Sequence, residues 1–474
     1  MRFTIAGHAA LYVEAEGRSL IVDPWLVGSC YWRSWWHYPP IEHLDDAWFD
    51  PDFIYLTHHH FDHFHYPSLR RMNKRATVYV PRFGVDFMVD ELRDLGFTSV
   101  VEMDHGVTHN LEGSFEITSY QAGFDDSALI VKDNTAVLAD FNDAKIRGRA
   151  LGQILDAHGS PTFLLKNHSW AQAYPHCYTS PDRADLELIN RDEKVAVFLA
   201  TVREARPAFA IPFASNVCFL HPDTRQYNDT AITPFDVAEA FAKDDTLDSE
   251  LVIMGPGDHW SAGHGFEVTD LSDFVTHRDE RIDRMAAAVE PQITKSLADE
   301  AALTLDYATF AAHFTRFLKA LPPFASRVLS KPVVFEVPSQ QPAFWVLDFA
   351  DRTVSRSATV PAVYASVIVI NEGLLADAIE KNILYQVSIS MRVRVALSAG
   401  GVGVDLMFWA LLAMWELGYL PLQSRLDART LGVAWRRRRE FTDGLLPKLV
   451  GRGALVERMA SNLKPDEPAA SASR

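Results

Sequence analysis

The chain has 474 residues and a net charge of -17; 48% of its residues are hydrophobic and 23% are charged. A chain of this length is too long to fold around one hydrophobic core of ordinary size, and its composition excludes disorder for most of its residues. We therefore expect at least two folded domains. The negative charge argues against nucleic-acid binding, because a protein that binds a phosphate backbone needs a positive field.

The N-terminal residues predict two strands joined by a turn at Glu16-Gly17, without the basic and apolar segments of a signal peptide. The cysteines Cys30, Cys177 and Cys218 form no CxxC pair, so neither a disulfide framework nor a thiolate zinc site is indicated. We therefore expect a cytoplasmic protein. One dense basic run occurs late in the chain, from Arg436 to Arg439.

Short β-branched runs alternate with helical segments in the first part of the chain, as in the strand FIYL at 53–56 and the helices at 67–74 and 84–96. This alternation predicts a mixed α/β domain, with sheets covered by helices, over residues 1–268. The polar, charge-rich stretch that follows predicts a solvated linker helix over 269–299.

The C-terminal part predicts a smaller α+β domain over residues 300–457, because runs of strands follow a helical segment. Its closing segment, Leu406 to Leu420, is interrupted by Glu416 and is shorter than the ~20 residues needed to cross a bilayer. We expect a buried helix there and no membrane span. The small, polar residues 458–474 predict a flexible tail. The expected strands lie within 333–338, 344–358, 365–371 and 385–399.

A dense histidine motif, YLTHHHFDHFHY, begins at the end of the apolar strand FIYL and occupies residues 55–66. If the chain turns into a loop after Thr57, four side chains leave the strand end close together and can converge on one or two cations. Neutral imidazoles suit Zn²⁺ and Fe²⁺, and a carboxylate adds charge for a second metal. In an accidental histidine cluster, the preceding strand and the embedded aspartate would both be coincidences. The four side chains are those of His58, His60, Asp62 and His63.

This HxHxDH spacing resembles the signature of the metallo-β-lactamase fold, whose opening hairpin is similar to GHAALYVEAEGRSLIVDPWL in this chain. The resemblance implies an αββα sandwich, followed here by the smaller α+β domain. More narrowly, three segments are similar to the CMP-N-acetylneuraminate hydroxylase group, an iron-dependent branch of the fold. They are DPWLVGSCYWRSWWHYPP, YLTHHHFDHFHYPSL and PAFAIPFASNVCFLHPDTRQYN, within residues 1–265.

The resemblance also implies metal-site residues outside the first motif. Asp23 is expected to support the metal loop. A bridging aspartate is expected at the end of a later strand, where we favour Asp143 over its competitor Asp140. A further ligand is expected in the segment FLHPDT, at His221. The alternatives are a turn or cap aspartate for Asp143 and a buried structural histidine for His221.

One histidine of the family's hydrolases has no counterpart in this chain. It would lie near residues 115–131, between the first motif and the bridging aspartate, and Gln121 or Asp125 could take its place. His105 and His109 are nearby, but they lie in a polar turn where histidines are more often exposed than metal-bound. The absence disfavours a symmetric two-zinc hydrolase.

Two other histidines, His168 in KNHSWAQAYP and His259 in GPGDHWSAGHG, are candidates for substrate binding or proton relay. With Asp62 they form our set of candidate catalytic residues, and structural roles are the alternative for both histidines. An aromatic-rich loop follows Asp23 and serves either packing or the wall of a ligand pocket. Its tryptophans are Trp25, Trp32, Trp35 and Trp36.

The resemblance favours an iron-dependent monooxygenase that hydroxylates an N-acyl amino-sugar nucleotide or a similar polar substrate. In the hydroxylase group a Rieske iron–sulfur domain supplies electrons, and its ligands form a CxH and a later CxxH pair, a combination that is absent here. We therefore expect a separate ferredoxin or Rieske-type electron donor. The alternative is a zinc-dependent hydrolase of a phosphodiester, lactone or sulfate ester, which needs no electron donor.

The strands and closing apolar helix of the C-terminal domain are similar in pattern to sterol-carrier-protein-type modules, which are attached to some metallo-β-lactamase-fold sulfatases. Such modules hold apolar ligands in a tunnel. A dimerisation or lid domain explains the same pattern.

Overall fold

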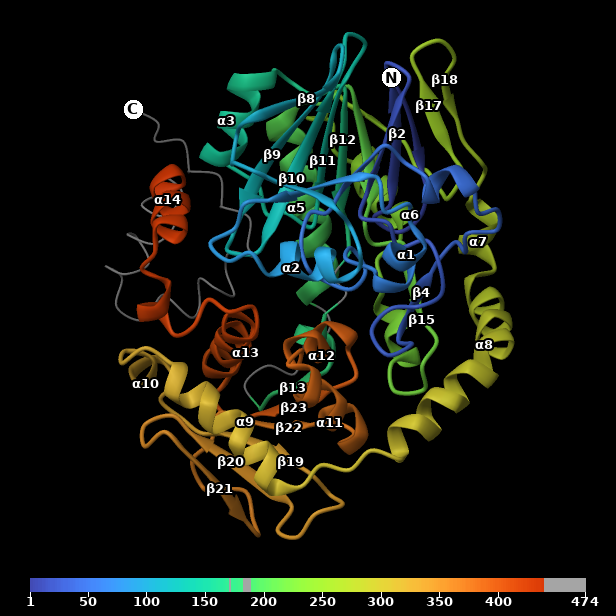
Figure 1. The fold of residues 1–474 in the computed structure, drawn as a ribbon. Coiled ribbons are helices and arrows are strands. Elements are labelled where there is room, and N and C mark those ends of the chain that lie inside the picture. Colours follow the sequence, from blue (N-terminus) through green and yellow to red (C-terminus); the bar gives the residue numbers. More distant parts are fainter. Residues whose placement is uncertain (170–171, 182–188, 439–474) are drawn as a thin grey trace, which may run out of the picture.

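The computed structural model describes residues 1–169, 172–181 and 189–438 (Figure 1). The expected tail at 458–474 and the last residues of the predicted C-terminal domain lie outside this part of the chain. The described residues form two sheets that pack on each other, a third sheet at the bottom of Figure 1, a small two-stranded sheet, and helices around them.

The first two sheets pack face to face and share one apolar core, in which Phe3, Leu11, Leu129 and Phe163 are fully buried. The predicted turn between β2 and β3 is confirmed, because Glu16 and Gly17 both have positive φ (51° and 74°), as a tight hairpin turn requires. The order of the first sheet is β18-β17-β1-β2-β3-β5-β6-β7. The order of the second sheet is β16-β14-β12-β11-β10-β9-β8.

The strands of the first sheet are β1 (Arg2–Ile5), β2 (Leu11–Ala15), β3 (Arg18–Val22), β5 (Phe53–Tyr55), β6 (Thr77–Pro81), β7 (Ser99–Met103), β17 (His259–Ser261) and β18 (Gly265–Glu267). The strands of the second sheet are β8 (Thr108–Glu112), β9 (Phe115–Ala122), β10 (Asp126–Lys132), β11 (Val137–Asn142), β12 (Phe163–Asn167), β14 (Phe209–Phe213) and β16 (Glu250–Leu251).

Helices cover the outer face of each sheet. Leu69 of α1 and Leu92 of α2 pack on the first sheet, while Leu151 of α3 and Phe198 of α5 pack on the second. Burial of these apolar faces holds the four layers together, at about 25 cal/mol per Å². The αββα sandwich predicted from the sequence is therefore confirmed. The covering helices are α1 (Tyr66–Arg71), α2 (Phe87–Asp94), α3 (Arg149–His158), α5 (Ile189–Ala205) and α6 (Pro234–Ala242).

The third sheet, β13-β23-β22-β19-β20-β21, forms the smaller α+β part with the helices packed on it. Phe310 and Phe408 on two of these helices are fully buried against Phe335 and Trp345 of the sheet. Its strands are β13 (Tyr178–Thr179), β19 (Val333–Glu336), β20 (Phe344–Asp348), β21 (Thr353–Ser357), β22 (Ser366–Val369) and β23 (Arg394–Leu397). Its helices are α9 (Tyr307–Ala320), α10 (Ala325–Val328), α11 (Glu372–Lys381), α12 (Tyr385–Ser390) and α13 (Val402–Glu416).

Several segments connect the sandwich to the third sheet. Helices α7 (Ser272–Thr276) and α8 (Arg278–Ala301) occupy the range expected for the linker, and α8 runs along the side of the molecule (Figure 1). Trp25 and Trp35 of the aromatic loop are buried in the same core as the third sheet, which is a packing role. The strand β13 comes from inside the predicted first domain, so the two predicted domains interlock. The remaining elements are β4 (Trp35–His37), β15 (Val217–Phe219), α4 (Ala173–His176) and α14 (Ala428–Arg436).

One expected strand is wrong in part. Residues 385–399 begin as the helix α12, and only Arg394–Leu397 pair as the strand β23. The carboxylate of Glu416 accepts hydrogen bonds from the backbone nitrogens of Leu384 and Tyr385 (2.9 and 2.8 Å). This contact satisfies N–H groups that a helix start leaves without a partner, and it outweighs the strand preference of a β-branched run.

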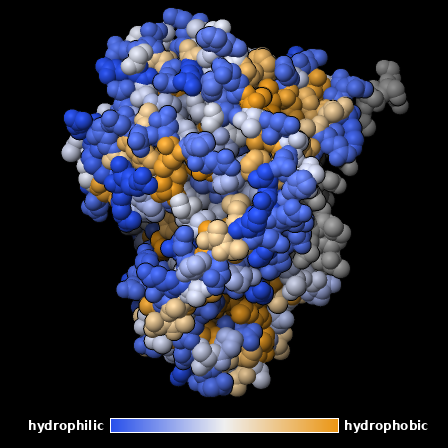
Figure 2. Space-filling model, turned by 90° about the vertical axis from the view of Figure 1, so that its right-hand side faces the viewer, coloured by the Kyte–Doolittle hydropathy of each residue, from blue (hydrophilic) through white to orange (hydrophobic). Residues whose placement is uncertain are grey.

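The face of the molecule in Figure 2 is mainly hydrophilic, with hydrophobic residues in small separate patches. In the described part of the chain, no helix is both long and apolar enough to cross a membrane. The apolar helix expected at the end of the C-terminal domain is α13, whose Phe408 and Leu412 are fully buried.

Candidate metal centre

The loop with the histidine motif starts where β5 ends, beside the end of its parallel neighbour β3. Asp23, just after β3, holds this loop by accepting hydrogen bonds from the backbone nitrogen and Oγ1 of Thr57 (2.8 and 2.6 Å). Asp23 also accepts from Nδ2 of Asn142, at the end of β11 (2.8 Å), and lies 2.7 Å from Nδ1 of His63. When Nδ1 of a histidine donates to a carboxylate, its Nε2 is left to bind a metal.

Two groups of side chains can each hold a cation. In each group, one ligand atom per residue lies within 4.8 Å of the others, and each group supplies two imidazoles and one carboxylate. The two groups are neighbours, because Nε2 of His63 in the second lies 3.5 Å from Oδ2 of Asp143 in the first. The arrangement therefore accommodates two adjacent cations. The first group is His58, His60 and Asp143, and the second is His8, Asp62 and His63.

The donor set fits metal binding. Nε2 of the fully buried His63 has no hydrogen-bond partner among the described residues, although carboxylate oxygens of Asp62 and Asp143 lie 3.3 and 3.5 Å away. A buried imidazole nitrogen without a partner is costly unless an ion or water satisfies it. In the first group, Nε2 of His58 lies 2.8 Å from Nδ1 of His60, so both nitrogens can face one cation.

The pKa shifts agree with this fit. Burial lowers the pKa of His58 well below its usual range and that of His60 to about 4, so both rings are neutral, as metal ligands must be. Burial also opposes a charge on His63, but the carboxylates of Asp62 and Asp23 outweigh it and raise the pKa of His63 well above its usual range. A cation bound between these groups would take the place of that proton.

His8 is a member of the second group that the sequence analysis missed. It follows β1, and its Nε2 lies 3.0 Å from Oδ2 of Asp62. The other oxygen of Asp62 accepts a hydrogen bond from the hydroxyl of Tyr31 (2.5 Å). The only sequence signal for His8 was its place directly after the first strand.

Asp126 occupies the region where the family's hydrolases have a histidine. Its Oδ1 lies 3.4 Å from Nδ1 of His58. The two residues that the sequence analysis named for this role are placed differently. The amide of Gln121 donates to the backbone oxygen of Arg82 (2.9 Å), and Asp125 belongs to neither group. Burial raises the pKa of Asp126 well above its usual range, and the charges of Asp143 and Asp125 add to this effect.

Four other predicted or competing residues lie outside both groups. Asp140 is fully buried; within the described structure its oxygens have no hydrogen-bond partner, and burial raises its pKa well above the usual range, which keeps it neutral. Nδ1 of the buried His221 accepts from the backbone nitrogen of Asp223 (3.1 Å). The remaining two are His168 and His259.

His168 and His259 have different surroundings. His168 is fully buried just after β12, and neither of its ring nitrogens has a hydrogen-bond partner in the part of the chain that the structure describes. Burial, followed by the charge of Lys194, lowers the pKa of His168 to about 3. His259 lies on β17, where its Nε2 is 3.3 Å from Oε1 of Glu267 on the paired strand β18.

The C-terminal part contributes to the metal loop from α12. The hydroxyl of Tyr385 lies 3.1 Å from Nδ1 of His59, and Nε2 of Gln386 donates to the backbone oxygen of His59 (3.0 Å). His59 is located between the two ligands His58 and His60. These contacts fix the loop from the side opposite the sandwich strand.

The fold and this centre define a metal-dependent enzyme of the metallo-β-lactamase fold. Residues 2–162 match the family described as Beta-lactamase superfamily domain, in agreement with the fold of this part of the chain.

The chain is also similar to curated relatives. It is 32% identical over 247 residues to a protein of Mycolicibacterium smegmatis named as a Rieske 2Fe-2S iron-sulfur protein, covering 48% of this chain and 46% of the relative. It is 24% identical over 241 residues to the cytidine monophosphate-N-acetylneuraminic acid hydroxylase of Danio rerio, covering 48% and 40%. The chain thus spans about half the length of the curated relatives it matches.

Solved structures give a weaker likeness. The chain is 20% identical to CmlA, a diiron beta-hydroxylase from Streptomyces venezuelae, with a TM-score of 0.35 over 45% of this chain and 44% of CmlA. Other similar structures are metal-dependent hydrolases. At this level the likeness carries no argument about the reaction.

Proposed function

We propose that this metal-dependent enzyme is an iron-dependent monooxygenase that takes electrons from a separate donor. The composition of the two ligand groups carries the proposal, since each offers two histidines and one carboxylate. This is the ligand set of non-haem iron oxygenases, and some zinc hydrolases use it as well. The similarity to a named hydroxylase favours iron.

The chain's own residues hold and tune the centre. Iron bound there would supply the activation of dioxygen. Asp23 fixes the ring of His63, and Tyr31 fixes the carboxylate of Asp62. Such supporting hydrogen bonds orient ligands and typically change metal affinity or activity 10- to 100-fold. We also propose that the buried, neutral His168 serves the substrate as a hydrogen-bonding group, because its two ring nitrogens lack partners in the described structure.

The electron donor is part of the proposal. A Rieske cluster needs two cysteines and two histidines. The sequence contains CxxH once, at Cys218 and His221, and contains no CxH. We propose a ferredoxin or Rieske-type protein with its reductase as the electron donor. Two electrons from it and two protons would reduce one oxygen atom of O₂ to water, while the other oxygen atom is inserted into a C–H bond.

For the substrate we propose an N-acyl amino-sugar nucleotide or a similarly polar molecule, supported by the similarity to a hydroxylase of that substrate type. The test measures oxygen consumption and hydroxylated product with purified, iron-loaded protein. Reduced nicotinamide and oxygen alone give no turnover, and a ferredoxin or Rieske-type protein with its reductase restores it. Zinc-loaded protein that instead hydrolyses a phosphodiester, lactone or sulfate ester without oxygen would overturn the proposal.

A further inference from the structure

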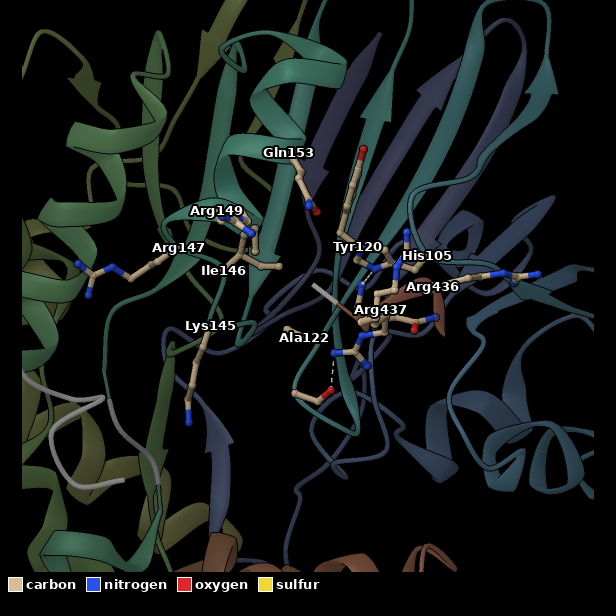
Figure 3. Close-up of a pocket in the computed structure, with 14 residues that line it drawn as sticks. His105, Tyr120, Ala122, Lys145, Ile146, Arg147, Arg149, Gln153, Arg436 and Arg437 are labelled. Atoms are coloured by element: carbon tan, nitrogen blue, oxygen red, sulfur yellow. Dashed lines mark hydrogen bonds between the residues drawn. The ribbon is translucent and has the colours of Figure 1, made fainter. Parts of the chain in front are cut away.

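A cavity of about 450 Å³ lies beside the candidate metal centre. Figure 3 shows Ile146 and Arg149 on one side of it and His105, Tyr120 and Arg437 on the other. A volume of this size suits a small organic molecule rather than a bare ion, because pockets for such ligands span about 300–1,000 Å³.

The lining of this cavity is strongly cationic in a chain whose net charge is -17. Among the described residues that line it, none is acidic. Cations gathered at a concave surface raise the local concentration of anions. Arginine and lysine are also the side chains that bind phosphate best. The cationic residues are Lys145, Arg147, Arg149, Arg436, Arg437 and Arg438.

These cations differ in their contacts. Arg437 donates to the backbone oxygen of Gly123 (2.5 Å), which fixes the end of α14 against the turn between β9 and β10. Arg436 forms an ion pair with Asp104. In Figure 3 the side chains of Arg147 and Arg436 extend outward in opposite directions. Lys145 and Arg149 are exposed and lie on the side of the cavity opposite Arg437, so they suit a test by substitution.

A second observation indicates an organic ligand with hydrogen-bond donors. Gln121 is one of the residues that line the cavity and is 3% exposed; its Nε2 donates to the backbone oxygen of Arg82, but its Oε1 has no hydrogen-bond partner in the described part of the chain. A buried acceptor without a partner calls for a donor from a ligand or water. A phosphate accepts hydrogen bonds from the cations, and a hydroxyl or amino group on the same molecule can donate to Gln121.

The cavity and the metal centre share two loops. Lys145 follows the metal-group residue Asp143 by two residues, and Gly123 precedes Asp126 by three. Since a chain advances at most about 3.6 Å per residue, these lining residues lie within about 7 and 11 Å of their site neighbours along the backbone. One molecule can therefore lie in the cavity and reach the metal centre.

We propose that this cavity binds the phosphate group of a small polar phosphate ester and presents the rest of that molecule to the metal centre. The inference rests on the proposed function only where it identifies the ester as the substrate. A freely dissolved phosphate ion has the same recognition chemistry, so the test must separate the two sources.

The test titrates full-length wild-type protein with uridine 5′-monophosphate, glucose 1-phosphate, their unphosphorylated counterparts uridine and glucose, and inorganic phosphate. The same titrations are made on Lys145→Gln/Arg149→Gln and on the matched surface control Lys295→Gln/Arg75→Gln. His60→Ala is included because phosphate also binds metals. Melting temperatures establish that each variant is folded, and the single variants replace the pair if it is not.

We expect at least one ester to bind wild type more tightly than its unphosphorylated counterpart and than inorganic phosphate. Its affinity should fall tenfold or more in Lys145→Gln/Arg149→Gln, because each lost charged hydrogen bond costs about tenfold. The surface control and His60→Ala should keep it. An unchanged affinity in the cavity variant, or a loss confined to His60→Ala, would overturn the inference.

Two further outcomes have distinct meanings. If inorganic phosphate binds as tightly as both esters do, the cavity holds a free ion and the substrate part of the inference fails. If the esters bind as expected while no donor system gives hydroxylation, the cavity assignment stands and the proposed function fails.

Discussion

Buried ionisable groups have different hydrogen-bond partners in the two parts of the molecule. In the C-terminal part, both oxygens of the buried Glu416 accept backbone hydrogen bonds from the start of α12. At the sandwich edge, Nε2 of the equally buried His63 faces two carboxylates and has no hydrogen-bond partner in the described structure. The first site is satisfied within the protein, while the second leaves a nitrogen that a bound cation would satisfy. The two side chains are equally buried, so the presence or absence of hydrogen-bond partners, rather than burial, distinguishes the structural Glu416 from the candidate ligand His63.

Removal of a candidate ligand should have the largest effect on metal occupancy and activity. His60→Ala removes one of three ligands of the first group, so metal occupancy and activity should fall by more than the 10- to 100-fold that loss of a supporting residue costs. Elemental analysis and turnover measure both. The exposed His264→Ala serves as the control. Full metal content and activity in His60→Ala would remove this group from the centre.

Two aspartates close in sequence, Asp143 and Asp140, compete for the role of the bridging aspartate. Asp143→Asn removes a charge that lies between the two groups. The metal affinity should fall about a hundredfold, with little change in melting temperature. Asp140→Asn should keep the metal, because Asp140 is already neutral and outside both groups. The opposite pattern, with activity lost only in Asp140→Asn, would reverse the assignment.

Asp126 should have a smaller effect than a ligand of either group. Asp126→Ala removes the side chain whose Oδ1 lies 3.4 Å from Nδ1 of His58, and we expect a 10- to 100-fold loss of metal affinity, measured by competition with a chelator. Asp125→Ala, one residue earlier, is the matched control and should stay near wild type. Equal losses in both variants would mean that the loop, and not the Asp126 carboxylate, supports the centre.

Glu416 in the C-terminal part should make the stability of the protein depend on pH. Burial raises the pKa of Glu416 to about 8, against about 4.3 for the unfolded chain. The folded state therefore binds the proton more tightly, and this stability is present at low pH and is lost as pH rises through about 8. Between these values the free energy of unfolding should fall by up to about 1.4 kcal/mol per pH unit. Glu416→Gln should abolish this slope in denaturant melts, and an unchanged slope would assign it to another group.

Sequence reasoning worked best where the information was local. The four candidate ligands of the histidine motif lie within six residues after one strand, and all four belong to the two groups that could hold a cation. The turn at Glu16-Gly17 is specified by its own residues. His8 and Asp126 were missed because each comes from another strand end and reaches the centre only through the pairing of the strands and the packing of the two sheets.

The same limit applies to features built from distant segments. Residues near 120 and 146 meet α14 only in the folded chain, so the basic run at Arg436 gave no sign of the cavity that it lines. The helix α12 was expected as a strand because its start depends on Glu416, more than thirty residues later. Tertiary contacts decided both outcomes.

The most direct test of the account is the metal content of protein purified without added metal, measured by elemental analysis on wild type and on His8→Ala. The proposed function predicts iron, and the two groups allow up to two ions per chain in wild type. His8→Ala should lose about half of this iron, because it removes a candidate ligand from the second group only. Colourless protein with zinc, or a content that His8→Ala leaves unchanged, would contradict the iron centre described here.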